Sequence, residues 1–231
     1  MSRLNYADAG YREMKVLFKA IRSGNLEEVR RFIEKKPELV NCTAKQPPKK
    51  DDGQSPLQVA IKTHNFEIAN YLIDQGADIN FMEDPAACCD DWCMPVLHIS
   101  VMAAVSCCRH NSQFATDSRV FFTEYSSAEE ADASFALLER LLTLGADVSA
   151  RESHGASLAW RLCRTAADML PQYCWNDDTV SPTAVVTPEW RHDLERIFRA
   201  LKAHGADFGE EEIQHYLSKP NHPLVPFLKY V

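Results

Sequence analysis

Thiol and imidazole side chains gather in the middle of the chain and raise the question of a metal site. They are Cys88, Cys89, Cys93, His98, Cys107, Cys108 and His110. Zinc is held by thiolates and imidazoles, usually through paired C-x₂₋₄-C elements. Cys89 and Cys93 have the spacing of one such element, but no second one follows because Cys107 and Cys108 are adjacent. The spacing therefore predicts no metal site, and a zinc- or redox-responsive cysteine module remains an alternative.

The chain also lacks the short motifs that mark common catalytic sites. It contains no G-x-S-x-G elbow, no G-x-x-x-x-G-K-[ST] phosphate loop and no H-E-x-x-H pair. Nothing in the sequence orients a cysteine toward a histidine as nucleophile and base. We therefore expect no enzymatic activity and no cofactor.

The charge balance argues against several classes of binding protein. The 231 residues include 25 Lys+Arg and 33 Asp+Glu, a net charge of −8. An acidic chain is poorly suited to bind nucleic acid in general, and anionic lipid repels it. A basic patch on one expected helix (Arg30, Arg31, Lys35 and Lys36) is interpreted as a solvated face.

The distribution of apolar residues bears on the location of the protein. No apolar run reaches the roughly 18–20 residues that span a bilayer, and residues 1–8 lack the apolar core of a signal peptide. We therefore expect a cytoplasmic protein with no membrane contact, whose eight cysteines are free thiols. We also expect it to be monomeric when no partner is bound.

One tripeptide recurs along the chain and indicates an internal repeat. It occurs as Gly76-Ala77-Asp78, Gly145-Ala146-Asp147 and Gly205-Ala206-Asp207. Apolar residues precede each copy at helical spacing, as in Phe66, Ile68, Ala69, Leu72 and Ile73. A glycine just beyond such a stripe is the expected end of a helix, because glycine adopts a left-handed backbone at little cost.

A shorter helix is expected before each of these amphipathic segments. Ser55-Pro56 is typical of a helix start, with serine as the N-cap and proline in the first turn. Residues 95–101 and 157–163 occupy the same place in the next two units. Residues 17–29 predict both helices of an N-terminal unit, and residues 211–218 and 223–230 predict two helices after the last copy.

One stretch of the chain resembles an ankyrin repeat, whose pattern is G-x-T-P-L-H-x-A, then a second helix, then G-A-D-[VI]-N. The residues that carry the resemblance are Gly53-Gln54-Ser55-Pro56-Leu57-Gln58-Val59-Ala60, Phe66-Glu67-Ile68-Ala69 and Gly76-Ala77-Asp78-Ile79-Asn80. Leu97-His98-Ile99-Ser100 with the second tripeptide forms another match, and Gly155-Ala156-Ser157-Leu158-Ala159-Trp160 with the third forms a weaker one. The resemblance covers about residues 12–218.

The resemblance implies an all-α, ankyrin-like helical repeat solenoid of about four repeats plus caps, in a single domain over 1–231. The tripeptides are 69 and 60 residues apart, whereas uninterrupted ankyrin repeats recur at about 33. We therefore expect two long inter-helix insertions, at 106–131 and 171–189. The expected units are 12–41 as the N-terminal capping repeat, 49–81, 89–150 and 151–208 as repeats, and 209–231 as the C-terminal cap.

The resemblance also implies a partner surface, because ankyrin proteins usually bind through hairpin tips and the concave face. The tip positions are Lys49, Asp51, Asp52, Gln54, Asp91, Trp92, Met94, Arg151, Ser153 and His154. Trp92 is the strongest candidate, since an exposed tryptophan is a typical interface anchor. The alternative is that Trp92 folds back over the neighbouring hairpin.

The expected insertions are rich in apolar residues. They contain Phe114, Val120, Phe121, Phe122 and Tyr125 in the first, and Tyr173, Trp175, Val185 and Val186 in the second. We expect the two insertions to pack against each other, with acidic residues left at the rim. The expected function is protein–protein recognition without chemistry, either as a scaffold or adaptor or as a dedicated inhibitor of a protein with a basic surface.

Overall fold

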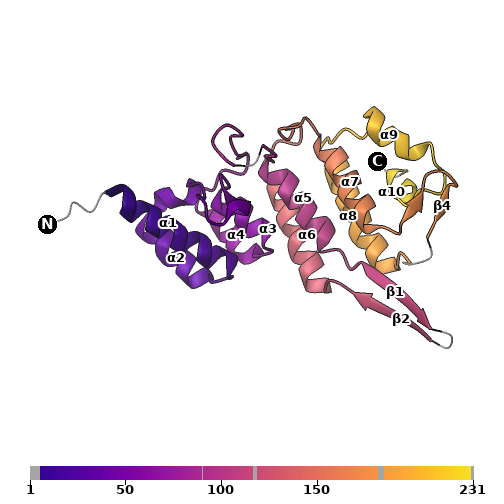
Figure 1. Cartoon of the computed structure of the whole chain (residues 1–231), viewed down its shortest axis with the longest axis horizontal. Helices are drawn as coiled ribbons and strands as arrows, with labels where there is room; N and C mark the ends of the chain where they lie inside the picture. The colour runs from indigo at the N-terminus through magenta and orange to yellow at the C-terminus, as the bar shows by residue number, and fades with distance from the viewer. Residues whose placement is uncertain (1–5, 90, 117–118, 182–184, 230–231) are drawn as a thin grey trace. The chain divides into compact units, whose positions relative to one another are not determined.

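The computed structural model describes residues 6–89, 91–116, 119–181 and 185–229. These residues form helices in sequential pairs, with two short β-hairpins between later helices (Figure 1). The chain folds into two compact units. The N-terminal unit comprises the residues up to Ile99 and Glu152–His154, and the C-terminal unit comprises Ser100–Arg151 and the residues from Gly155 onward.

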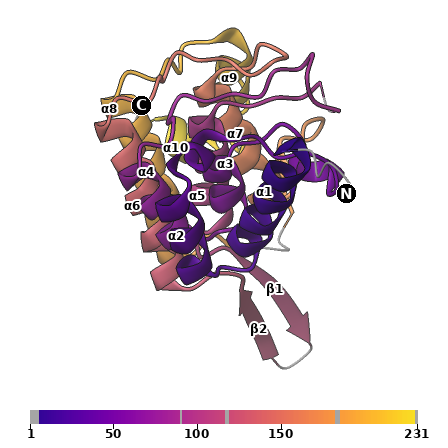
Figure 2. The ribbon, with the colours of Figure 1, turned by 90° about the vertical axis from the view of Figure 1, so that its left-hand side faces the viewer.

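The N-terminal unit is built from two antiparallel helix pairs. Its elements are α1 (Tyr6–Arg22), α2 (Leu26–Lys35), α3 (Pro56–Lys62), α4 (Phe66–Asp74), the start of α5 (Val96–Ser106) and the 3₁₀ turns η1 (Pro37–Asn41) and η2 (Lys49–Asp51). Helix α1 packs on α2 and α3, and α2 packs on α4, as Figure 2 shows. Leu17, Ile33 and Leu72 are fully buried between these helices.

The predicted starts and ends of the helices are confirmed at several positions. Ser55 caps α3 by accepting a hydrogen bond from the backbone N–H of Gln58, and the Gln58 side chain accepts in return from the Ser55 N–H. Gly76, Gly145 and Gly205 follow α4, α6 and α8 with φ of +86°, +87° and +90°. The recurring tripeptide therefore ends a helix each time, because its glycine takes the left-handed backbone.

The C-terminal unit contains the remaining helices. They are the rest of α5, α6 (Ala128–Thr143), α7 (Leu158–Met169), α8 (Pro188–Ala203), α9 (Glu211–Leu217) and α10 (Val225–Leu228). Helix α8 contacts α6, α7 and α10, so it lies at the centre of this unit. Trp190 and Phe198 of α8 and Phe227 of α10 are its largest fully buried side chains.

The all-α description expected from the sequence is incomplete. Strands β1 (Asn111–Thr116) and β2 (Arg119–Glu124) pair antiparallel between α5 and α6, from Asn111 opposite Glu124 to Thr116 opposite Arg119. Strands β3 (Tyr173–Cys174) and β4 (Thr179–Val180) form a smaller hairpin between α7 and α8. Both hairpins fall in the segments expected as insertions, where β-branched and aromatic residues favour strands.

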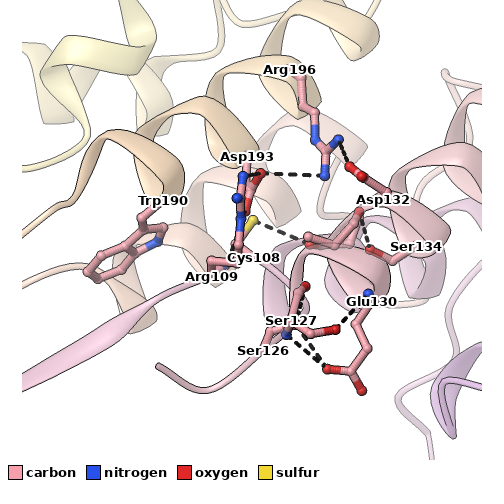
Figure 3. A network of polar contacts seen from close by, with 12 residues as sticks. Cys108, Arg109, Ser126, Ser127, Glu130, Asp132, Ser134, Trp190, Asp193 and Arg196 are labelled. Carbon is pink, nitrogen blue, oxygen red and sulfur yellow. Dashed lines mark hydrogen bonds and ion pairs between the residues drawn. The ribbon is translucent and has the colours of Figure 1, made fainter. Parts of the chain in front are cut away.

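A buried ion-pair network holds the base of the first hairpin to α8 (Figure 3). The Arg109 backbone N–H and Nε donate to Asp193 Oδ2 over 3.0 and 2.8 Å, and Nη2 donates to Oδ1 over 2.7 Å. Arg196 lies 3.5 Å from the same carboxylate and pairs with Asp132 of α6 over 2.5 Å. Burial alone would raise the pKa of Asp193, but the hydrogen bonds and charge of Arg109 hold it below its usual value.

The two insertions contact each other, since Asn111 Nδ2 donates to the Val185 carbonyl over 3.1 Å, but the expectation that their apolar side chains bury each other is wrong for the described residues. Val120 and Phe122 of β2 are 52% and 56% exposed. Trp175 of the second hairpin stacks instead on His215 of α9, with ring centroids 4.8 Å apart. The β1–β2 hairpin extends beyond the helices that it connects (Figure 1), and every residue of β2 is exposed. The side chain of Phe114 lies outside the described residues.

Candidate partner-binding surface

The first of the predicted tips is not a β-hairpin but the closed loop 44–54, which precedes α3. The Ala44 N–H donates to the Gln54 carbonyl over 2.8 Å, and the Gly53 N–H donates to the Ala44 carbonyl over 2.9 Å. Lys49 is exposed at this tip, whereas Asp52 is half-buried. The loop therefore presents its charged residues from a hydrogen-bonded frame.

Two of the predicted partner-binding residues of this loop are internal. Asp51 is fully buried and pairs with Arg22 over 2.8 Å and with Lys62 over 2.7 Å. Gln54 is also buried and accepts a hydrogen bond from Lys62. The sequence interpretation of Asp51 and Gln54 as partner contacts is corrected, because both side chains are used to hold the loop against α1 and α3.

The second tip, which precedes α5 and contains Cys88 and Cys89, lies directly against the first tip. The Cys89 N–H donates to Asp52 Oδ2 over 3.0 Å. Burial alone would raise the pKa of Asp52, but hydrogen bonds from Gln46 and Cys89 hold it below its usual value. Gly53 approaches Cys88 so closely that a Cβ added to the glycine would lie 2.7 Å from the Cys88 Cβ. The two tips therefore form one surface.

A buried glutamate, which sequence reasoning missed, supports the second tip from below. Glu83 is 4% exposed, and its Oε2 accepts from Gln58 Nε2 and from the Met94 N–H, each over 3.1 Å. Gln58 Nε2 also donates to the Met94 carbonyl over 2.8 Å. Met94, a predicted contact residue, is therefore half-buried and held through its backbone.

The third tip continues the row within the N-terminal unit. Ser153 donates its N–H to the Cys93 carbonyl over 3.0 Å, and its hydroxyl accepts from the Cys93 N–H over 2.9 Å. The same hydroxyl donates to the Asp91 carbonyl over 2.6 Å. His154 Nε2 lies 3.9 Å from the exposed Asp91 carboxylate. Three successive tips are thus joined by hydrogen bonds, each of which involves at least one main-chain group.

Trp92 combines exposure with a fixed position. Its side chain is 44% exposed, and its indole N–H donates to Glu152 Oε2 over 2.6 Å. The indole contacts the neighbouring tip through Glu152, as the alternative interpretation expected, and part of the side chain remains exposed to solvent. Glu152 was missed because a lone glutamate in a turn carries no signal of its partner.

The ten predicted contact residues thus fall into three groups. Exposed in the N-terminal unit are Lys49, Asp91, Trp92 and His154; half-buried are Asp52, Met94 and Ser153; buried are Asp51 and Gln54. Arg151 is exposed but belongs to the C-terminal unit, where it donates to Glu210 over 2.6 Å and to the Gly155 carbonyl over 2.7 Å. We define the tip row as Lys49, Asp52, Asp91, Trp92, Ser153 and His154.

The cysteine cluster has a different arrangement from the one that its spacing suggested. The Sγ atoms of Cys88 and Cys93 lie 3.4 Å apart, whereas the Cys89 thiol donates to the Lys49 carbonyl over 3.6 Å. Within the described parts of the chain, no group of three or more His, Cys, Asp or Glu side chains is placed to hold a metal ion. Burial raises the pKa of Cys107 to about 11, which keeps it a thiol at neutral pH.

Comparison with known families agrees with this geometry. The family model for ankyrin repeats (3 copies) matches residues 3–83, which include α1–α4 and the first tip. Residues 3–83 are therefore similar to ankyrin repeats, and this match together with the helical structure supports a helical repeat fold. Ankyrin repeats generally mediate protein–protein interactions and generally lack catalytic chemistry, and the match supports a protein-binding role. No helix in the described residues has the length and apolar character needed to cross a membrane.

Proposed function

We propose that this protein is a recognition module that binds another protein through the tip row. The observation that carries the proposal is the state of Trp92, which is 44% exposed yet hydrogen-bonded to Glu152. A large aromatic side chain that is ordered before binding loses little conformational entropy when a partner covers it. Tryptophan is also among the residues most enriched at energetic centres of interfaces.

The charges near the second tip favour a partner with a basic surface. Residues 63–108 contain seven Asp+Glu and no Lys or Arg, a local net charge of −7. The Asp91 side chain is 87% exposed beside Trp92 and supplies one of these charges at the tip itself. Such a field accelerates the capture of a basic partner and selects against acidic ones. A scaffold or adaptor, and a dedicated inhibitor of a basic protein, both fit this surface.

We also propose a repeat organisation. The helix pairs α1–α2, α3–α4, α5–α6 and α7–α8 are four successive repeats, and α9–α10 form the C-terminal cap. Support comes from the family match at residues 3–83 and from the positive-φ glycine that ends α4, α6 and α8. In this arrangement the two β-hairpins are insertions between the helices of the third and fourth repeats.

A specific observation favours a second candidate function, a redox response at the second tip. Cys88 and Cys93 have their Sγ atoms 3.4 Å apart beside Trp92. An oxidant that removes two electrons and two protons from this pair would leave a disulfide within the proposed binding surface. In this proposal the redox state of the Cys88–Cys93 pair controls partner binding, and partner binding remains the function of the protein.

The experiment that tests the proposed function is site-specific photo-crosslinking in source cells. A photoreactive amino acid is placed at Asp91, beside Trp92, and in a matched variant at Leu144, which is 52% exposed in the C-terminal unit. The expected result is one predominant basic protein crosslinked from position 91 and absent from position 144. Recovery of the same proteins from both positions would refute the tip row as the binding surface.

The captured partner is then purified and titrated against the intact protein and two variants. Trp92→Ala is expected to weaken binding by about 30-fold or more, the loss typical of a central aromatic anchor. Leu144→Ala is expected to leave the dissociation constant unchanged. Equal affinity of the Trp92→Ala variant and the intact protein would remove Trp92 from the interface.

A further inference from the structure

A cavity of about 190 Å³ lies between α1 and the loop that follows η1, on a part of the N-terminal unit that the tip row does not use. Its lining residues are Met14, Lys15, Phe18, Lys19, Arg22, Ala44, Lys45, Pro47 and Pro48. Four of the nine are cationic, and none of these described lining residues is acidic. A cation-lined cavity is unexpected in a chain whose net charge is −8.

The charge of the cavity reflects a charge asymmetry along the chain. Residues 1–50 contain 12 Lys+Arg and 6 Asp+Glu, a net charge of +6, and the remaining residues are strongly acidic. All four cationic lining residues come from this N-terminal stretch. The local potential at the cavity is therefore positive, opposite in sign to that of the second tip.

Most of the cationic groups around the cavity are available to a ligand. Arg22 uses Nη1 to pair with Asp51. Among the described residues, Lys15, Lys19 and Lys45 form no ion pair, and the Lys15 ammonium lies 4.4 Å from the centroid of the Tyr11 ring. Three ammonium groups without a carboxylate partner repel one another, and an anion placed between them relieves this repulsion.

The walls of the cavity are formed before any ligand binds. The Tyr11 hydroxyl donates to the Gln46 carbonyl over 2.8 Å and so ties the loop to α1. The loop is also closed by the hydrogen bonds that join Ala44 to Gly53 and to Gln54. Phe18 is 3% exposed, and it contributes apolar surface with the two prolines of the loop. Walls that are formed in advance and combine apolar surface with charged groups are a feature that this small cavity shares with ligand sites.

We propose that this cavity binds a phosphorylated side chain of a peptide segment in a partner protein. A phosphate monoester carries a charge of about −1.5 to −2 at neutral pH, so it matches several cations better than a single carboxylate does. The apolar walls accommodate the residue next to the phosphorylated one. An anionic membrane is a poorer occupant, because residues 51–231, with 13 Lys+Arg and 27 Asp+Glu, carry a net charge of −14 and are repelled by its surface.

The test titrates the full-length protein with the synthetic peptide Gly-Ala-pSer-Ala-Gly and with its unphosphorylated form. Lys19→Glu and Lys45→Glu alter the cavity, and Lys35→Glu on α2 makes the same charge change outside it. We expect the phosphopeptide to bind and the unphosphorylated peptide not to bind. Each cavity variant is expected to weaken binding at least about tenfold, while Lys35→Glu and Trp92→Ala retain it within about twofold.

Several outcomes would overturn the proposal. They are no phosphopeptide binding up to about 5 mM, equal binding of both peptides, or an equal loss in Lys19→Glu and Lys35→Glu. Sedimentation with vesicles of phosphatidylcholine and phosphatidylserine forms a separate arm. Vesicle binding that depends on Lys19, without peptide binding, would assign the cavity to a membrane instead. Because the Trp92→Ala variant is included, failure of the tip row and failure of this cavity are distinguished.

Discussion

The close approach of the first two tips, at Gly53 and Cys88, can be tested by adding a single methyl group to Gly53. Gly53 has φ of +82°, and an added Cβ would lie 2.7 Å from the Cys88 Cβ. Gly76 has nearly the same backbone, with φ of +86°, but an added Cβ there meets no atom within 4 Å. Gly53→Ala and Gly76→Ala therefore share the backbone cost and differ in the steric one.

The expected magnitudes follow from these two terms. An alanine in the left-handed region costs about 1–2 kcal/mol, offset in part by the smaller entropy of the unfolded chain. Gly76→Ala should therefore lower the free energy of unfolding by roughly 1 kcal/mol. At Gly53 the methyl group meets a Cβ, which cannot rotate away, and such overpacking adds about 1–3 kcal/mol. We expect a total loss of roughly 2–4 kcal/mol for Gly53→Ala.

The assay is equilibrium urea unfolding of the full-length protein, followed by circular dichroism. Cys88→Gly removes the opposing Cβ, so the double variant with Gly53→Ala should recover most of the additional loss. Losses for Gly53→Ala and Gly76→Ala that agree within about 0.5 kcal/mol would refute the close contact of the tips. So would a double variant that shows simple additivity.

Four further predictions concern three sets of titratable and reactive groups: the Asp193–Arg109 pair, His222, and the Cys88–Cys93 pair. Asp193→Ala should lower the free energy of unfolding by about 3–5 kcal/mol, because it leaves the Arg109 guanidinium without its carboxylate partner. Urea unfolding measures this change, and a loss below about 1 kcal/mol would contradict the buried ion pair. The intact protein should also lose this contribution as pH falls through the lowered pKa of Asp193, since the unfolded state binds the proton at higher pH. Burial lowers the pKa of His222 to about 4. The contribution of the neutral imidazole to the free energy of unfolding is therefore present above about pH 6.5 and is lost as pH falls toward 4. NMR titration of the ring measures this, and a midpoint near 6.5 would exclude a buried neutral imidazole. Hydrogen peroxide should oxidise Cys88 and Cys93 to a disulfide with release of two waters. Peptide mapping detects this disulfide, which should be absent in the Cys88→Ser variant. A Cys88–Cys93 pair that stays reduced while other thiols react would contradict the proximity of the two sulfur atoms.

Local patterns alone predicted the helices and their ends. The Ser55-Pro56 start and the glycine stop at Gly76 depend on interactions within a few residues, so the sequence indicated both correctly. The β1–β2 hairpin was missed because the helical repeat pattern dominated the interpretation. Its signal was nonetheless local, a run of β-branched and aromatic residues at 120–123.

The amino-acid sequence by itself determined the helical repeat framework and the order of the tips along the chain. Only the tertiary structure decided that Asp51 is internal, because its burial depends on Arg22 and Lys62 from two other segments. The same holds for Trp92 and Glu152, which are 60 residues apart, and for Arg109 and Asp193, which are 84 apart. Capping and periodicity act within one or two helical turns and leave a trace in the sequence. Pairing between distant side chains depends on the path of the whole chain, and a single sequence carries no sign of it.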